Sequence, residues 1–257
     1  MNNYQLQVIS YASKTLTMNK DIIIALPPNF EETKSYVTYL VFDGKDLLLN
    51  NHNILTNNNS NCVYIGISST NNMTRFNDLA MYTNSEVKTL MTKYFPILTS
   101  SNINSLGGNG ENYLAFIENE VLPFVTNKFK LKIISLNALG CSMGAYFCLQ
   151  MLYCSSLTFN TMILLSPAIW FNEQIFNDLA IKALNKNQPL TIKLWVGKKE
   201  PKFFEGKIST NYESNTICLE QLLISHKIIT TIMIDNNGSH GFKWWINYLN
   251  NNPLIFV

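Results

Sequence analysis

Apolar and polar residues follow one another in short blocks along the chain, and the spacing within each block predicts its secondary structure. Residues 4–13 alternate between the two kinds, and residues 21–30 hold an apolar run that Pro27 and Pro28 end. We expect these blocks to form two strands of an antiparallel hairpin, joined near residues 17–20. Further apolar runs predict buried strands at residues 35–44, 62–69, 132–140, 159–171, 190–200 and 228–236.

Other blocks have apolar residues at helical spacing. Residues 111–129 combine this spacing with acidic residues near the start, which is typical of an amphipathic helix. Helices are also predicted at residues 143–155, 173–184, 215–227 and 241–249. Residues 47–61 are rich in Asn, which favours a solvated loop, with a helix starting near Asp46 as the alternative. Residues 74–110 show little periodicity, and we expect loops there.

Predicted strands therefore alternate with predicted helices after an antiparallel start. This order predicts an α/β fold with a mostly parallel central sheet, right-handed crossovers and helices on both faces. The pattern contains no internal repeat and no linker, so residues 1–257 are expected to form a single domain. Ligands bind such sheets at the carboxyl ends of the strands, which makes the residues just after each strand the candidates for chemistry.

Composition narrows the choice of partners. The chain is 47% hydrophobic and 14% charged, which is enough apolar material for a sizeable core. The formal net charge is +2 without a long basic run, so neither nucleic acid nor an anionic membrane is an expected partner. No apolar stretch approaches the ~18 residues that span a bilayer. The first residues do not resemble a secretory signal, so we expect a cytoplasmic protein of undetermined oligomeric state.

Cysteine usage argues against a metal or disulfide framework. The five cysteines are an odd number without CxxC spacing, and they are expected to be reduced thiols of the core: Cys62, Cys141, Cys148, Cys154 and Cys218. No group of His, Cys, Asp and Glu has the spacing of metal ligands. The glycines at residues 105–110 lack both the dinucleotide-binding spacing and a Walker lysine. We therefore expect neither a metal nor a cofactor.

One short stretch carries a candidate nucleophile. Ser142 lies between Gly140 and Gly144, and this Gly-x-Ser-x-Gly pattern falls between a predicted strand and a predicted helix. That setting is the one a nucleophile elbow requires, because the turn is too tight for side chains at the two glycine positions. The amide of Met143 would then point to where an oxyanion forms. The alternative is an ordinary turn serine or a helix N-cap.

A serine nucleophile needs a base and an acid that orients it. Of the three histidines, His52 precedes the serine and His226 ends a helix, whereas His240 follows the last predicted strand. His240 is therefore the expected base. The acid of this fold lies between serine and histidine in the chain, and seven residues qualify: Glu173, Asp178, Glu200, Glu205, Glu213, Glu220 and Asp235. Glu200 is preferred because it lies just beyond a strand, with Glu205 and Asp235 as the alternatives.

The second oxyanion donor is expected in the loop after an earlier strand. Asp43 and Gly44 follow such a strand, so the amide of Gly44 or of Lys45 is the candidate, although Asp-Gly is also a common turn. The aromatic residues Trp170, Trp244 and Trp245 are candidates for lining a pocket or for packing in the core.

Taken in order, these segments resemble the putative-esterase family of α/β-hydrolases, which includes S-formylglutathione hydrolase and the enterochelin and bacillibactin esterases. The matching segments cover nearly the whole chain: "LPPNF", "YLVFDGKDLL", "VYIGI" with Arg75 following, "GGNGENYLAFIENEVLPFV", "GCSMGAY", "LLSPAIWF", "WVGKKE" and "GSHGFKWW". The family elbow usually ends in two glycines, and here Ala145 takes the second place. The segment 198–206 has no counterpart that can be aligned, which leaves substrate contacts there undefined.

The resemblance is greatest to the siderophore-esterase branch. It implies an α/β-hydrolase fold and a triad of Ser142, His240 and Glu200, with Arg75 and Trp170 contacting the substrate. The leading hypothesis is a serine ester hydrolase acting on a small ester, such as a siderophore trilactone or its iron complex. A general short-acyl carboxylesterase or thioesterase is the second hypothesis. A catalytically silent α/β-hydrolase that only binds its ligand is the third.

Overall fold

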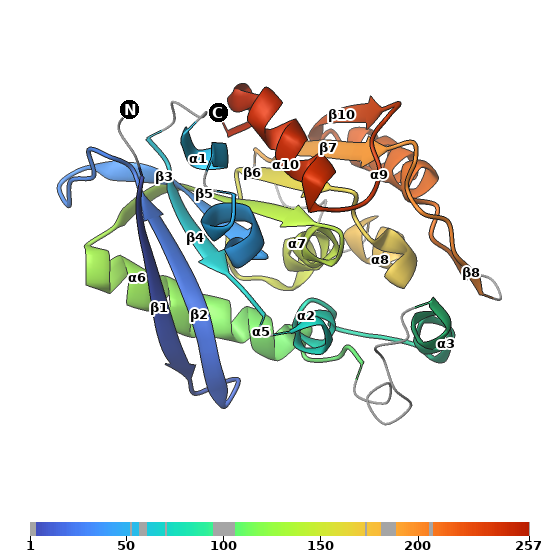
Figure 1. Cartoon of the computed structure of the whole chain (residues 1–257), viewed down its shortest axis with the longest axis horizontal. Helices are drawn as coiled ribbons and strands as arrows, with labels where there is room; N and C mark the ends of the chain where they lie inside the picture. The colour runs from blue at the N-terminus through green and yellow to red at the C-terminus, as the bar shows by residue number, and fades with distance from the viewer. Residues whose placement is uncertain are drawn as a thin grey trace.

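The computed structural model describes residues 4–51, 53–56, 61–69, 71–94, 106–172, 174–180, 189–205 and 208–256. At its centre lies an eight-stranded sheet with the strand order β1-β2-β4-β3-β5-β6-β7-β10 (Figure 1). The strands span Gln5–Ser13 (β1), Met18–Leu26 (β2), Ser35–Phe42 (β3), Val63–Ile67 (β4), Lys132–Cys141 (β5), Thr161–Leu165 (β6), Thr191–Gly197 (β7) and Ile229–Asp235 (β10).

The sheet is antiparallel at one edge and parallel elsewhere. β1 pairs antiparallel with β2, with Gln5 opposite Leu26, and β2 pairs antiparallel with β4. All pairs from β4 to β10 are parallel. The predicted hairpin and the mostly parallel sheet are both confirmed, and the carboxyl ends of the parallel strands meet at one edge of the sheet.

Both faces of the sheet are covered, because successive side chains of a strand point to opposite faces. Ile22 and Ile24 belong to one apolar cluster, and Ile23 between them belongs to the other. The larger cluster packs under α5 (Gly110–Phe116), η2 (Ile117–Val121), α6 (Leu122–Phe129), α7 (Met143–Cys154), α8 (Ile175–Asp178) and α9 (Tyr212–Ser225). The smaller one packs under η1 (Lys45–Leu49), α1 (Asn53–Thr56), α10 (Phe242–Asn251) and η5 (Pro253–Phe256). Figure 1 shows α10 and α1 on one side of the sheet and α5–α6 on the other.

Two helices occupy a region where loops were predicted. α2 spans Asn72–Asp78 and α3 spans Ser85–Tyr94. Asn71 caps α2 by accepting a 2.9 Å hydrogen bond from the amide of Thr74. In α3 the buried residues Val87, Leu90 and Met91 do have helical spacing, but they form a single turn, which is too short to stand out as a periodic pattern.

Other sequence predictions are corrected in detail. The Asn-rich segment is not simply solvated, because Leu47 and Leu48 of η1 and Ile54 and Leu55 of α1 are buried. Its residues His52 and 57–60 lie outside the described residues. A two-stranded ribbon, β8 (Phe204–Glu205) with β9 (Ile208–Ser209), was not predicted. The helix predicted at 173–184 is described only as far as residue 180.

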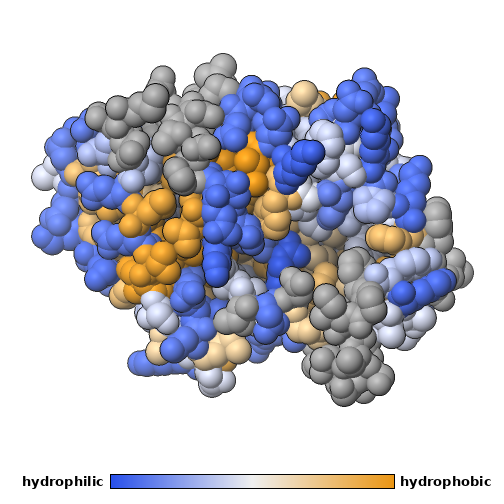
Figure 2. Space-filling view, in the orientation of Figure 1, coloured by the Kyte–Doolittle hydropathy of each residue, from blue (hydrophilic) through white to orange (hydrophobic). Residues whose placement is uncertain are grey.

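Among the described residues, no helix is long and apolar enough to cross a membrane. Figure 2 shows a largely hydrophilic face with a hydrophobic area over the β1–β2 hairpin, where the Val8 side chain is 51% exposed.

Candidate active site

Ser142 lies on a strained turn at the carboxyl edge of the sheet. β5 ends at Cys141 and α7 begins at Met143, so Ser142 alone makes the turn, with a φ of 53°. A non-glycine residue with positive φ is uncommon and is found where surrounding structure enforces it. Gly140 permits the turn, since a Cβ there would lie 2.3 Å from the backbone carbon of Gly144. Gly144 is less restricted than predicted, because its Cβ would come no closer than 3.1 Å to Phe42.

Three side chains from different loops form a continuous hydrogen-bonded chain. Nε2 of His240 lies 3.0 Å from Oγ of Ser142, and Nδ1 of His240 lies 2.6 Å from Oε2 of Glu200. Ser142 and Glu200 are buried, and the imidazole is 23% exposed. A carboxylate can only accept a hydrogen bond, so the Nδ1 proton points to Glu200 and Nε2 is left to accept from the serine hydroxyl.

The loops that carry the acid and the histidine are joined to each other. The amide of Lys199 donates to the carbonyl of Gly238 at 2.8 Å, and the hydroxyl of Ser239 donates to the carbonyl of Lys199 at 2.6 Å. Gly197 and Gly238 approach so closely that a Cβ on Gly197 would lie 2.3 Å from the Gly238 backbone. These contacts bring the end of β7 and the loop after β10 together, which places His240 beside Glu200.

Contacts that the sequence did not predict hold the carboxylate of Glu200. The hydroxyl of Ser166 donates to Oε1 of Glu200 at 2.6 Å, and the amide of Gly197 donates to the same oxygen at 3.3 Å. Nε1 of Trp245 donates to the Ser166 hydroxyl at 2.9 Å, and its ring meets the His240 ring edge-on at 4.8 Å. Ser166 directly follows β6. The expectation that site residues lie just after the strands is therefore the signal that could have identified it.

The other candidate acids and bases lie elsewhere or are not described. Asp235 directs Oδ1 to the amide of Asn237 at 2.9 Å, within its own loop. The side chain of Glu205 lies outside the described part of the structure, as does His52. His226 caps the end of α9, where its Nδ1 lies 3.0 Å from the carbonyl oxygen of Leu222.

Three backbone amides are candidates for binding the oxyanion. Two of them are free to donate a hydrogen bond among the described residues, and one is not. The amide of Lys45 donates to the hydroxyl of Ser68 at 2.6 Å, which removes it from the pair of alternatives. Within the described ranges, the amides of Gly44 and Met143 donate no hydrogen bond. Gly44 needs to be glycine, since a Cβ there would lie 2.4 Å from Cα of Gly66.

The side chain of Arg75 binds the loop that carries Gly44. Its Nε and Nη2 bind the two carboxylate oxygens of Asp43 at 2.6 and 2.7 Å, and Nη2 also donates to the carbonyl of Cys141 at 3.2 Å. Asp43 has a φ of 61°, so this bidentate pair holds the loop in a conformation that a non-glycine residue rarely adopts. The expected substrate contact of Arg75 therefore stays a prediction, with Nη1 as its uncommitted nitrogen among the described residues.

A comparison with protein families identifies the family of this chain. The sequence profile of the family described as "Putative esterase" matches residues 13–254. The chain belongs to this esterase family. Membership makes it a carboxylic ester hydrolase. No match was found among curated protein sequences.

Solved structures resemble this esterase over its whole length. The BES protein from Bacillus cereus is 18% identical with a TM-score of 0.73, covering 100% of this chain and 95% of its own. The siderophore hydrolase EstB from Aspergillus nidulans is 16% identical with a TM-score of 0.73, covering 100% and 96%. The IroE-like serine hydrolase from Shewanella oneidensis is 15% identical with a TM-score of 0.73, covering 98% and 79%. At these identities the likeness shows the α/β-hydrolase fold.

Tyr212 of the esterase lies beside the histidine, and Trp170 lies beside Tyr212. Trp170, in the short helix η3 (Ile169–Phe171), is buried, and its expected contact with substrate stays a prediction. Its ring meets that of Tyr212 at 6.4 Å, and Tyr212 packs on His240 with ring centroids 4.6 Å apart. Tyr212 was not predicted as a site residue, because it begins a helix and follows no strand of the main sheet.

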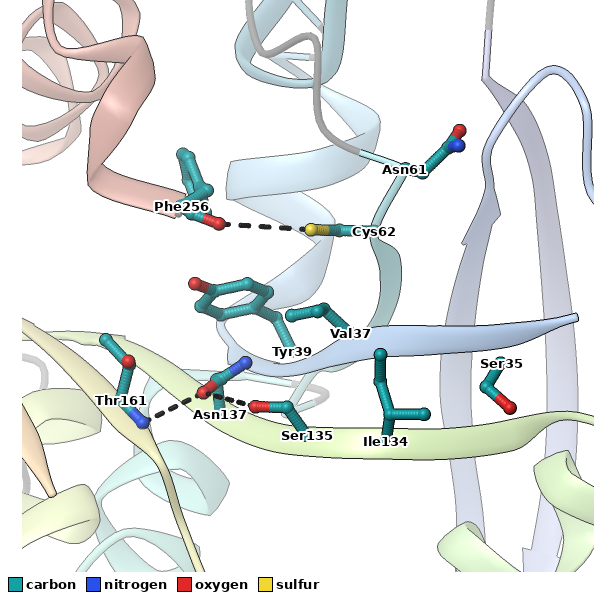
Figure 3. A pocket seen from close by; sticks show the side chains of 10 residues that line it. All are labelled: Ser35, Val37, Tyr39, Asn61, Cys62, Ile134, Ser135, Asn137, Thr161 and Phe256. Atoms are coloured by element: carbon teal, nitrogen blue, oxygen red, sulfur yellow. Dashed lines mark hydrogen bonds between the residues drawn. The ribbon is translucent and has the colours of Figure 1, made fainter. Parts of the chain in front are cut away.

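Two cavities lie at opposite ends of the strands. One of about 380 Å³ adjoins the Gly44 loop and is lined by polar residues: Asp43, Lys45, Asp46, Asn50, Ser68, Ser69, Asn71 and Arg75. The other, of about 400 Å³, lies at the amino ends of β3, β5 and β6, far along the strands from Ser142. Figure 3 shows Tyr39, Asn137 and Thr161 lining this second cavity.

Thiols take no part in the candidate site as the structure describes it. Burial raises the pKa of Cys141, the neighbour of Ser142, well above its ordinary value. Cys62, Cys141 and Cys148 are buried as expected, whereas Cys154 and Cys218 are exposed, which corrects the prediction that all are core thiols. The described residues contain no group of three or more His, Cys, Asp or Glu side chains able to hold a metal ion.

Proposed function

We propose that this esterase cleaves its ester by a Ser-His-Glu mechanism, with Ser142 as nucleophile, His240 as general base and Glu200 as orienting acid. The observation that carries the proposal is the hydrogen-bonded chain from Ser142 Oγ through the imidazole to Glu200. Glu200 keeps the proton on Nδ1 and stabilises the imidazolium that forms when Nε2 takes the serine proton. The single tautomer leaves Nε2 free to accept that proton.

The negative charge that develops on the carbonyl oxygen is held by the amides of Gly44 and Met143 in this proposal. Both amides lie in turns next to Ser142 or to the neighbouring strand β3, and both lack other acceptors among the described residues. One such donor contributes about 3 kcal/mol to lowering the barrier. His240 then protonates the leaving alcohol, and a water molecule activated by the same imidazole releases the acid.

We propose a polar ester of the siderophore class, a trilactone or its iron complex, as the substrate. Neighbours in the comparison include a siderophore hydrolase and a protein described as an enterobactin and salmochelin hydrolase. The cavity beside the Gly44 loop supports a polar substrate, since its lining side chains are polar or charged. The ammonium group of Lys45 is available there, because no ion pair or hydrogen bond to another described residue engages it.

The first experiment tests the nucleophile. A fluorophosphonate probe should label the wild-type protein and the Ser225→Ala control, and Ser142→Ala should abolish labelling and lower kcat by about 10⁴-fold or more. Ser225 is a matched control because, among the described residues, its hydroxyl bonds only at its own helix end, to Leu222 and His226. Folded protein that takes no label would favour a silent binding module and overturn the proposal.

The second experiment tests the substrate class. Hydrolysis rates of an enterobactin-like trilactone and of short acyl esters are compared with the same enzyme. The siderophore proposal expects a kcat/KM for the trilactone that exceeds the short-ester value. Hydrolysis of short esters with none of the trilactone would instead identify a general short-acyl carboxylesterase.

A further inference from the structure

Tyr212 presents a polar group to the candidate site that the proposed mechanism does not use. The side chain is only 5% exposed, and its ring lies against the imidazole of His240 at 4.6 Å with an interplanar angle of 41°. Tyr212 is the first residue of α9, and Asn211 caps that helix by accepting from the amide of Ser214 at 3.3 Å. The position of the phenol is therefore set by a capped helix and by packing against the base.

The phenol ring of Tyr212 lies in an aromatic group with His240 and Trp170 and is shielded from water. Burial raises the pKa of Tyr212, and the Glu200 carboxylate raises it further, while hydrogen bonding by Trp170 and Ser142 acts in the opposite direction. The phenol therefore stays protonated and remains a hydrogen-bond donor in the neutral range.

Trp170 adds an independent geometric observation. Its indole is 4% exposed, and its Nε1 has no hydrogen bond of normal geometry within the described ranges. A buried N–H without a partner is costly, and such groups in native structures often serve function. The indole ring meets the Tyr212 ring edge-on at 6.4 Å, so a second buried donor lies beside the phenol.

These two aromatic residues lie on the side of Ser142 opposite the oxyanion loop. In the sheet, β5 has β3 on one side and β6 on the other. Gly44 follows β3, whereas Trp170 follows β6. An ester carbon bonded to Ser142 with its carbonyl oxygen toward Gly44 thus directs another substituent toward His240 and Tyr212. The leaving oxygen is the substituent that must reach His240, because it takes its proton from Nε2.

We propose that Tyr212 is a further catalytic residue whose phenol donates a hydrogen bond to the leaving oxygen of the ester. The inference rests on the proposed Ser142 mechanism. When the tetrahedral intermediate collapses, the electron pair on the oxyanion reforms the carbonyl and the bond from carbon to the leaving oxygen breaks. The Nε2 proton of His240 passes to that oxygen, and the phenol stabilises the charge there without giving up its own proton.

The test is a series of esters that share one acyl group and differ in the alcohol. Values of kcat/KM are measured because they report acylation, the step in which the alcohol leaves. Tyr212→Phe keeps the ring that packs on His240 and removes only the hydroxyl. We expect it to lower kcat/KM for an ethyl ester about 10- to 100-fold, the range for a hydrogen bond to a charged group. For a p-nitrophenyl ester, whose leaving group departs without assistance, we expect a loss below about 3-fold.

Two further variants keep the result interpretable. Trp170→Phe retains the phenol and removes the indole N–H, and we expect a smaller loss with the same dependence on the leaving group. Tyr248→Phe, on α10 and packed on Trp195, is the control and should leave all rates unchanged. An equal loss across the ester series, or none, would overturn the role of Tyr212. Full activity of Ser142→Ala would instead overturn the mechanism on which the inference rests.

Discussion

Ser166 donates a 2.6 Å hydrogen bond to the Glu200 oxygen that faces away from His240. Ser166 is fully buried and has a φ of 46°, so the surrounding fold holds its backbone in an uncommon conformation. Trp245 completes the arrangement by donating to the Ser166 hydroxyl while its ring packs on His240. The acid and the base are thus oriented by one buried group of contacts.

Ser166→Ala is expected to lower kcat about 10-fold with little change in KM. Removing the hydroxyl takes one donor from the Glu200 carboxylate and leaves Nε1 of Trp245 without its acceptor, so the acid is held less firmly. Steady-state kinetics provide the measurement. Trp245→Phe, which keeps an aromatic ring against His240, should give a smaller loss. A Ser166→Ala enzyme with a normal kcat would show that this hydrogen bond is dispensable.

Glu200→Gln is expected to lower kcat by about 10²- to 10⁴-fold, since an amide supports the wrong imidazole tautomer and cannot stabilise the imidazolium. Asp235→Asn is the matched control, because Asp235 lies nearby but bonds to Asn237 within its own loop. It should change kcat less than about 3-fold. Comparable losses in the two variants would contradict the choice of Glu200 as the acid.

The variants Gly140→Ala and Gly144→Ala should differ sharply in stability, although both glycines belong to the Gly-x-Ser-x-Gly pattern. At Gly140 the new methyl group would overlap the backbone of Gly144, which cannot move without opening the turn. At Gly144 the nearest atom is Cβ of Phe42 at 3.1 Å, and a shift of a few tenths of an ångström relieves the contact. We expect loss of soluble or active protein for the first and a Tm change of a few degrees for the second. Equal stability of the two variants would refute this difference.

Lys20 and Asp78 form a fully buried ion pair between β2 and α2, the helix that carries Arg75. Lys20→Met leaves the Asp78 carboxylate buried without its counter-ion, so we expect a loss of about 3–5 kcal/mol in the free energy of unfolding. The double variant Lys20→Met/Asp78→Asn should recover part of this loss. Urea unfolding of both single variants and the double variant measures the coupling, and additive losses would argue against it.

The carboxyl group of Glu120 makes the folding stability of the protein vary with pH in the acidic range. Desolvation acts to raise the pKa of Glu120, but hydrogen bonds from Thr15, Lys14 and Ser13 at the hairpin turn outweigh it and lower the pKa. A lowered folded-state pKa means that the stabilisation is present above the ordinary value of about 4.3 and is lost as pH falls through the folded-state value. Wild type should therefore exceed Glu120→Gln in Tm at pH 7, and the difference should shrink toward pH 3. A difference independent of pH would disprove the linkage.

The sequence predicted the strands of the main sheet and the helices with long apolar faces, because their periodicity reports burial directly. It failed for α3, whose buried apolar positions extend over a single turn. It also failed for α2, whose ends are defined by a cap at Asn71 and a buried ion pair at Asp78. The candidate residues Ser142, Glu200 and His240 were found because topology places every strand end at the same edge of the sheet. Local pattern and strand order were sufficient for these features.

Tertiary structure alone decided how those residues are held. Ser166 and Tyr212 follow no recognisable motif, and each is placed by groups distant in the chain that become neighbours only on folding. The choice of Gly44 over Lys45 as oxyanion donor also depends on the folded chain, because the amide of Lys45 already donates to the hydroxyl of Ser68. Sequence therefore determined the fold class and the candidate reacting groups, since both depend on local periodicity and order. The supporting contacts depend on distances between separate loops, and these exist only in the folded chain.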